Sequence, residues 1–406
     1  MSDAKLYENA GAMTKACLDE LLNGSYTFFD EATDDYTKEY LLDYGFRSFS
    51  DGLTDCILRH GFPGNAASIE EKTAFIKEKC AEKNIPMNAV NIRNWFSEKR
   101  PVSSSTSREL VYRLCFALEF SLQEVIDFFL RVYFECPFNF RSHEEVVCCY
   151  CFAKSLGYQH AQDLKKKADD LLSKAEPNEP AFEFTTMIGA GLCDLDSDEA
   201  LLRYIEKNSS EFLANNRTAY RYAAELIGEA TKLAKKLFEM DDAVQNSLFS
   251  EKSTRHLEKK ENVDLFLYML LGVDVLQYTK EKSFARAAEF PELVRSNFPL
   301  RMQLSKIRSG EKVSYDTMRK ALILLNFYCY FAALFYENRH DPYFCSIESD
   351  FLAFAAETND LLISCGYPRL YVRNPFDWLI MHCGNLPYPL EEFKDAVRRY
   401  YVDIIV

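Results

Sequence analysis

Four polar side chains with amide or guanidinium groups gather on one side of a predicted helix. Apolar residues at helical spacing predict this helix over residues 88–96, with Ile92, Trp95 and either Ala89 or Val90 on its buried side. The opposite side then carries Asn88, Asn91, Arg93 and Asn94. Asn can bond bidentately to adenine and Arg to guanine in the major groove of duplex DNA. These residue types therefore favour contact with base edges.

Further basic and polar residues follow this helix and recur late in the chain. Lys99 and Arg100 come directly after it, where positive charge can neutralise DNA phosphates without reading sequence. A later segment surrounds the apolar Leu304 and Ile307 with outward-facing polar residues, namely Arg301, Gln303, Ser305 and Lys306. The simpler alternative is that both sets are ordinary exposed positions on helices.

The basic residues stand out because the whole chain is acidic, with a formal net charge of −14. Residues 72–113 contain nine Lys and Arg against four Glu, and residues 293–320 contain seven against two acids, so each window has a local charge of +5. The other 336 residues then carry −24. Helix faces that are basic by chance would explain one such window, but the two windows occupy matching places in a repeat, which favours a function.

The repeat is visible in two stretches of the chain. Residues 128–151 (FFLRVYFECPFNFRSHEEVVCCYC) align with residues 361–383 (LLISCGYPRLYVRNPFDWLIMHC) when a gap of one residue is allowed. Upstream, RPVSSSTSRELVYRLCFALEF at 100–120 resembles EKVSYDTMRKALILLNFYCYF at 311–331. Two diverged copies of one helical module are the simplest explanation, with Cys151 and Cys383 at equivalent buried sites.

The segment NIRNWFSEKRPVSSSTSRELVYRLCFALEFSLQEVIDFF resembles the latter half of a phage-repressor-type helix-turn-helix domain. In that family a recognition helix ends at an apolar anchor, a Gly-Lys-Arg-Pro-Ser type of turn follows, and two helices close the bundle. The resemblance implies an anchor at Trp95, a turn over 98–103 and closing helices over 106–118 and 121–133. The second copy, LSKIRSGEKVSYDTMRKALILL, retains the glycine of the turn at Gly310.

The connection before the predicted recognition helix departs from that family. Only the residues IPMN separate it from the basic helix that ends near Asn84, too few for the separate second helix that normally crosses the DNA backbone. Either this second helix is reduced or the bundle serves another purpose, since many such bundles bind protein.

Composition favours an all-α chain, because 32 Phe and 24 Tyr accompany few Val-rich alternating runs. We expect two related helix-turn-helix-like bundles joined by a middle helical region. The predicted domains are an N-terminal helical cap over 1–68, module one over 69–174, a middle region over 181–290 and module two over 291–406. The segment 175–182, with two prolines, is the expected linker, and the polar stretch 337–350 is an insertion in module two.

Helix starts are predicted from short polar motifs. Ser121 with Glu124, and Ser142 with Glu145, have the spacing of capping boxes. Asp377 follows an Asn-Pro pair and is expected to cap the next helix.

Motifs for catalysis and metal binding are weak. Cys148, Cys149 and Cys151 form the one cysteine cluster, and no second pair at ligand spacing accompanies them, so we interpret them as reduced core thiols. Gly-rich phosphate loops, GxSxG and HExxH do not occur, and the six His are dispersed. We therefore expect no enzyme activity, no cofactor and no metal.

These features predict a cytoplasmic DNA-binding transcriptional regulator whose partner is double-stranded DNA. The acidic N-terminus lacks the apolar core of a secretory signal, and the apolar run 321–336, interrupted by Asn326, is expected to be a buried helix. The alternative is an all-helical protein–protein interaction scaffold or adaptor that does not bind DNA. The sequence leaves the operator, any effector and the oligomeric state open.

Overall fold

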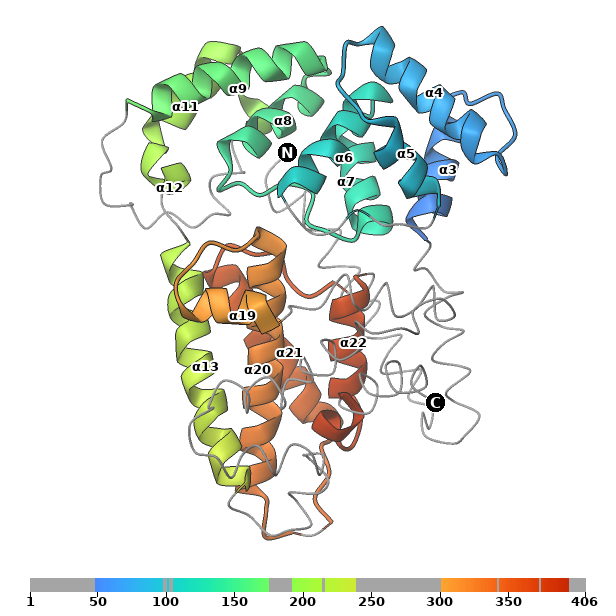
Figure 1. Ribbon diagram of the computed structural model, residues 1–406. Helices are drawn as coiled ribbons and strands as arrows, with labels where there is room; N and C mark the ends of the chain where they lie inside the picture. Colours follow the sequence, from blue (N-terminus) through green and yellow to red (C-terminus); the bar gives the residue numbers. More distant parts are fainter. Residues whose placement is uncertain are drawn as a thin grey trace. The chain divides into compact units, whose positions relative to one another are not determined.

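The chain is all-α in the part that the structure describes, which confirms the predicted fold class. The computed structural model describes residues 48–97, 101, 105–174, 192–213, 216–238, 301–341, 343–371 and 374–393, and these ranges hold fourteen α-helices and no strand (Figure 1). The helices divide into two compact units, whose described parts are residues 48–213 and 216–393. The division falls inside the span 181–290.

Unit one is a succession of short helices, most of which begin at a polar cap. Its elements are α3 (Phe49–Arg59), α4 (Ile69–Glu82), α5 (Ala89–Phe96), α6 (Ser105–Ala117), α7 (Leu122–Phe128), the π-helix η1 (Phe129–Tyr133), α8 (His143–Ala153), α9 (Tyr158–Leu172), the 3-10 helix η2 (Leu192–Asp194), α11 (Asp198–Lys207) and α12 (Ser209–Leu213). The helix predicted over 88–96 and the two closing helices are present. The capping box of Ser121 and Glu124 is complete, as predicted.

Aromatic rings fill the core of unit one around α6. The ring of Tyr112 stacks on Phe129 of η1, with centroids 4.9 Å apart, and Phe116 stacks on Phe152 of α8 at 4.2 Å. Stacked pairs of this kind stabilise beyond the area that they bury. They join α6 to the helices on either side of the loop that precedes α8.

Unit two has fewer and longer helices: α13 (Arg217–Phe238), α19 (Arg301–Arg308), α20 (Tyr315–Glu337), α21 (Glu348–Ser364) and α22 (Pro375–Gly384). α20 is long and apolar enough to cross a membrane by length and composition, but 78% of its apolar window is buried inside the unit. Burial of that extent is typical of a core helix. Residues 321–336 therefore lie in a buried helix, as predicted.

One buried interaction recurs in both units. Near the start of α6, Arg108 forms a bidentate pair with Glu145, with Nε to Oε1 at 2.9 Å and Nη2 to Oε2 at 2.6 Å. Near the start of α20, Arg319 pairs in the same way with Asp377, with Nη1 to Oδ1 at 2.8 Å and Nη2 to Oδ2 at 2.6 Å. The aligned repeat places Arg108 opposite Arg319 and Glu145 opposite Asp377. The shared bond supports the repeat.

Both carboxylates lie three residues after a helix cap. Asn374 caps α22, because its Oδ1 accepts hydrogen bonds from the backbone N–H groups of the two following non-proline residues, and Asp377 instead bonds Arg319. The prediction that Asp377 caps this helix is therefore wrong. The expected box at Ser142 is only half formed: its hydroxyl accepts from Glu145 N at 3.4 Å, while the Glu145 carboxylate turns to Arg108.

The same carboxylates also hold the loops that precede their helices. The backbone N–H of Asn139 donates to Glu145 Oε2 at 2.7 Å, and that of Tyr371 donates to Asp377 Oδ2 at 2.8 Å. Charge-assisted hydrogen bonds of this kind are the stronger ones in proteins. Each pair therefore fixes a loop as well as two helices.

Differences in length between the copies are absorbed in identifiable places. The aligned stretch has 24 residues in copy one and 23 in copy two. The π-helix η1 lies within this stretch of copy one, and a π-helix accommodates one extra residue per turn. Phe134 (φ 56°) ends η1 and Gly366 (φ 74°) follows α21, both in the left-handed region and both eleven positions before the carboxylate. Arg and carboxylate are 37 residues apart in copy one and 58 in copy two. Longer helices and the connection 338–347 take up this difference.

Arg108→Met and Arg319→Met should each lower the free energy of unfolding of their own unit by about 3–5 kcal/mol, because each leaves a buried carboxylate, Glu135 or Asp377, without its arginine. The chain has two tryptophans, Trp95 in unit one and Trp378 in unit two. Denaturant titrations in Trp378→Phe and Trp95→Phe backgrounds therefore follow the two units separately. Arg93→Met, which breaks an exposed pair, is the control and should cost less than about 1 kcal/mol. Losses as small for the buried arginines would contradict their role.

Unit two should lose stability as pH falls from about 6.5 to about 4. Burial lowers the pKa of His382 to about 4, and its ring stacks on Trp378 with centroids 4.7 Å apart. The unfolded chain takes up the proton near pH 6.5 and the native unit does not, so the stability present above that pH falls by about 3 kcal/mol. His382→Phe should remove this step from Trp378-detected unfolding. Unit one, with Tyr150 at the aligned position, is the internal control. An unchanged pH profile in His382→Phe would refute the assignment.

Candidate nucleic-acid interface

The apolar side of α5 holds this helix against α3 and α4. The buried residues of α5 are Ile92, Trp95 and Phe96. Trp95 meets Phe49 of α3 edge to face, with centroids 5.9 Å apart, and the carbonyl of Phe96 accepts a hydrogen bond from Ser50 Oγ at 3.2 Å. From α4, Lys72 Nζ lies 4.6 Å from the ring centroid of Phe96. The predicted anchor Trp95 is therefore a core residue.

α4 and α5 follow each other across a short turn. The six residues between them, 83–88, contain no helix, and Asn84 adopts a left-handed conformation with φ 54° that redirects the chain. Lys72 Nζ of α4 donates to Thr54 Oγ1 of α3 at 3.1 Å. The three helices α3, α4 and α5 thus pack on one another, although no helix lies between α4 and α5.

The four predicted base-contacting residues of α5 have different surroundings. Arg93 is exposed, and Asn91 and Asn94 are half-exposed. Asn88 is exposed but caps the helix, since its Oδ1 accepts from Val90 N at 2.8 Å. Val90 is 60% exposed, so of the two alternatives for the buried side the half-buried Ala89 remains. The methyl groups of Val90 instead add an apolar element to the solvent-facing side.

In unit two the predicted polar set is only partly outward. Leu304 and Ile307 are buried, as predicted, and Ser305 is exposed while Lys306 is half-exposed. Gln303 is half-buried, and its Nε2 donates a hydrogen bond to Thr317 Oγ1 of α20 at 3.4 Å. Its side chain therefore faces α20, and the prediction that it faces outward is wrong. The remaining predicted positions lie outside the described residues (Lys99, Arg100) or begin α19 with a side chain that is not described (Arg301).

Acidic neighbours accompany most described basic residues of the window 72–113. The exposed or half-exposed ion pairs are Lys79–Glu82 at 3.1 Å, Lys83–Glu119 at 3.3 Å, Arg93–Glu70 at 3.2 Å and Arg113–Glu109 at 3.3 Å. Glu70 and Glu119 lie outside that window in sequence, and Lys72 and Arg108 are buried. The count of +5 therefore overstates the positive charge that this window presents to solvent.

The pair beside α5 is nevertheless weak enough to exchange. The side chains of Arg93 and Glu70 are 60% and 73% exposed. Ion pairs exposed to this extent contribute less than about 1 kcal/mol. A guanine edge or a phosphate can therefore replace Glu70 as the partner of Arg93 at little cost.

Other chemistry finds little support in the described part of the chain. There, no group of three or more His, Cys, Asp or Glu side chains could hold a metal ion. Cys148, Cys149 and Cys151 lie in the core on α8, and burial raises the pKa of Cys148 to about 12. Thiols in this environment stay protonated near neutral pH, whereas a metal ligand or nucleophile requires the thiolate.

Comparison with models of protein families, with curated proteins and with solved structures finds no match to this chain. Functional inference therefore depends on the residues and geometry described above.

Two features of the structure were not predicted from the sequence. The pair of Arg108 and Glu145 could have been found, because the repeat sets arginine opposite arginine and carboxylate opposite carboxylate. An apolar hollow in unit two could not, because its walls come from three separate segments.

Cys345 should be the reactive thiol among the described cysteines of unit two. It is exposed, whereas the other ten cysteines with described side chains are buried. Labelling the native chain with a maleimide at pH 7.5, followed by mass spectrometry, should show one site fewer in Cys345→Ser and an unchanged number in Cys148→Ser. Labelling of Cys148 in the native chain would contradict its placement in the core.

Proposed function

We propose that unit one binds duplex DNA through α5, as the DNA-contacting part of a transcriptional regulator. One observation carries this proposal: α5 is seated by its apolar side on α3 and α4, while the opposite side presents Arg93, Val90 and two half-exposed asparagines to solvent. A helix entering the major groove needs this division between a fixed side and a readable side. Cytoplasmic localisation and the absence of a cofactor are part of the same proposal.

The order of the helices supports the resemblance to repressor-type domains. A short sequence between α4 and α5 suggested that the second helix of that family is missing. With α3 as the first helix and α4 as the second, α5 takes the place of the recognition helix, and α6 and α7 close the bundle. The turn 83–88 is then somewhat longer than the usual three to four residues.

The exposed groups suit both kinds of DNA contact. Arg93 can bond a guanine edge, a half-exposed Asn91 or Asn94 can bond adenine, and Val90 can contact a thymine methyl group. The exposed Lys77 and the predicted Lys99 and Arg100 would neutralise phosphates. The net charge of −14 would repel DNA from the remaining surface, so binding should be strongest at low salt.

The test is the anisotropy of fluorescein-labelled 30-base-pair duplexes with the full chain at 50 and 200 mM salt. Binding should weaken with salt, and Lys99→Ala with Arg100→Ala should weaken it for every sequence alike, reducing the log–log salt slope by roughly one per lost phosphate contact. For a site selected from random duplexes, Arg93→Ala should relax preference at one base pair by about 1–3 kcal/mol.

Arg203→Ala is the matched control, because Arg203 is an exposed helical arginine elsewhere in unit one. It should leave both affinity and preference unchanged. If the wild-type chain shows no salt-sensitive duplex binding even at low ionic strength, the proposal fails.

A second candidate function is a protein-interaction scaffold that does not bind DNA. The observation that favours it is the apolar hollow in unit two, which DNA binding would not require. The feature that favours it lies in unit two, so the DNA-binding test on unit one distinguishes the two functions.

A further inference from the structure

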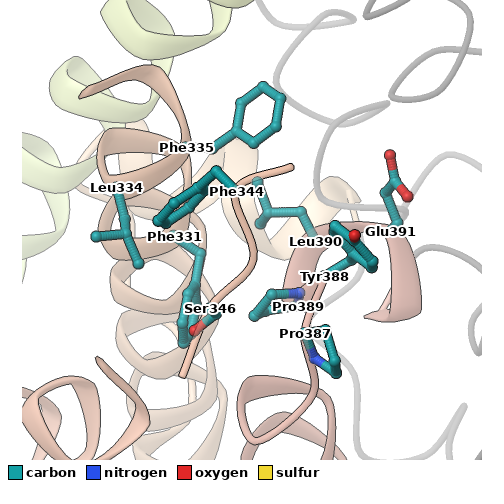
Figure 2. A pocket seen from close by; sticks show the side chains of 10 residues that line it. All are labelled: Phe331, Leu334, Phe335, Phe344, Ser346, Pro387, Tyr388, Pro389, Leu390 and Glu391. Carbon is teal, nitrogen blue, oxygen red and sulfur yellow. The ribbon is translucent and has the colours of Figure 1, made fainter. Parts of the chain in front are cut away.

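Unit two contains an open apolar hollow near the end of α20. Figure 2 shows the side chains that line it, which come from α20 (Phe331, Leu334, Phe335), from the segment after α20 (Phe344, Ser346) and from the segment after α22 (Pro387, Tyr388, Pro389, Leu390, Glu391). Aromatic and proline side chains make up most of its wall. Such a wall is typical of sites that take an apolar side chain.

The walls of the hollow are fixed to one another. The backbone N–H of Ser346 donates to the carbonyl of Pro387 at 2.8 Å, which ties the segment after α20 to the segment after α22. Phe331 is buried beneath, whereas Tyr388 is 47% exposed. The hollow is therefore largely formed before any partner arrives, which lowers the entropic cost of binding.

One carboxylate lines the hollow, and two more lie close to its lining residues in the chain. Glu391 contributes to its lining, Glu392 follows it in the chain, and Glu337 is exposed at the end of α20. The described residues from 337 to 393 include nine Asp and Glu against two Arg, and Asp377 is bound to Arg319 in the core. A positively charged partner would be complementary to this surface.

We propose that the hollow docks a basic segment of a partner protein, with one aromatic side chain inserted beside Tyr388 and a Lys or Arg next to Glu391. The aromatic side chain matches the apolar wall, and the flanking cation matches the carboxylate of Glu391. Tyr, Trp and Arg are also the residues that most often anchor protein interfaces. This docking is independent of DNA binding by unit one.

The test starts from a random twelve-residue peptide library displayed on phage and selected on the full-length chain. Enriched peptides should carry an aromatic residue with Lys or Arg within about three positions. The best peptide, made with fluorescein, is then titrated by anisotropy. Tyr388→Asp and Glu391→Lys should each weaken binding about tenfold or more. Leu352→Asp and Glu357→Lys are matched controls on exposed positions of α21, and they should change affinity less than about twofold.

Far-UV circular dichroism reports whether each variant is folded, and Tyr388→Ser replaces Tyr388→Asp if the latter is not.

The proposal is overturned if no peptide is enriched, if the enriched peptides are acidic or lack an aromatic residue, or if they bind Tyr388→Asp as well as wild type. Sedimentation equilibrium of the chain alone tests the other occupant. Self-association that Tyr388→Asp abolishes and Leu352→Asp preserves would identify a second copy of the chain in the hollow and would also overturn the proposal.

Discussion

A buried arginine that must be fully hydrogen-bonded is the constraint on which each unit depends. Removing a guanidinium from water is costly, and only good geometry with additional hydrogen bonds compensates for it. Both units meet this requirement with a bidentate carboxylate at the third position of a helix. The same carboxylate accepts a backbone N–H from the preceding loop, so one interaction fixes two helices and the chain between them.

The remaining acceptors around the arginine differ between the copies. Arg108 also reaches Glu135 Oε2 at 3.1 Å, whereas Arg319 donates to the carbonyls of Pro368 at 3.2 Å and Arg369 at 2.9 Å. Tyr367 lies ten positions before Asp377, as Glu135 lies ten positions before Glu145. The guanidinium is thus retained while its secondary partners change. This is consistent with a duplicated module whose copies diverged around one structural requirement.

Sequence reasoning succeeded where structure is local. The periodicity of Ile92 and Trp95 predicted α5, and the spacing of Ser121 and Glu124 predicted a capping box, because both signals concern residues within one or two turns. It failed where partners come from far along the chain. The direction of Gln303 depends on Thr317 of another helix. The charge of the first basic window depends on acids such as Glu119 that no local count includes.

The hollow in unit two shows the same limit, since residues 331–335, 344–346 and 387–391 become neighbours only through the fold. The repeat is the exception, because comparing the copies pairs distant positions without a structure.

The most direct measurement of the central claim is a double-mutant cycle for each pair, with Arg108→Met and Glu145→Gln in unit one and Arg319→Met and Asp377→Asn in unit two. Each cycle should give a favourable coupling free energy of about 1–3 kcal/mol, similar in the two units. Coupling near zero in either unit would contradict the claim that one shared interaction organises both.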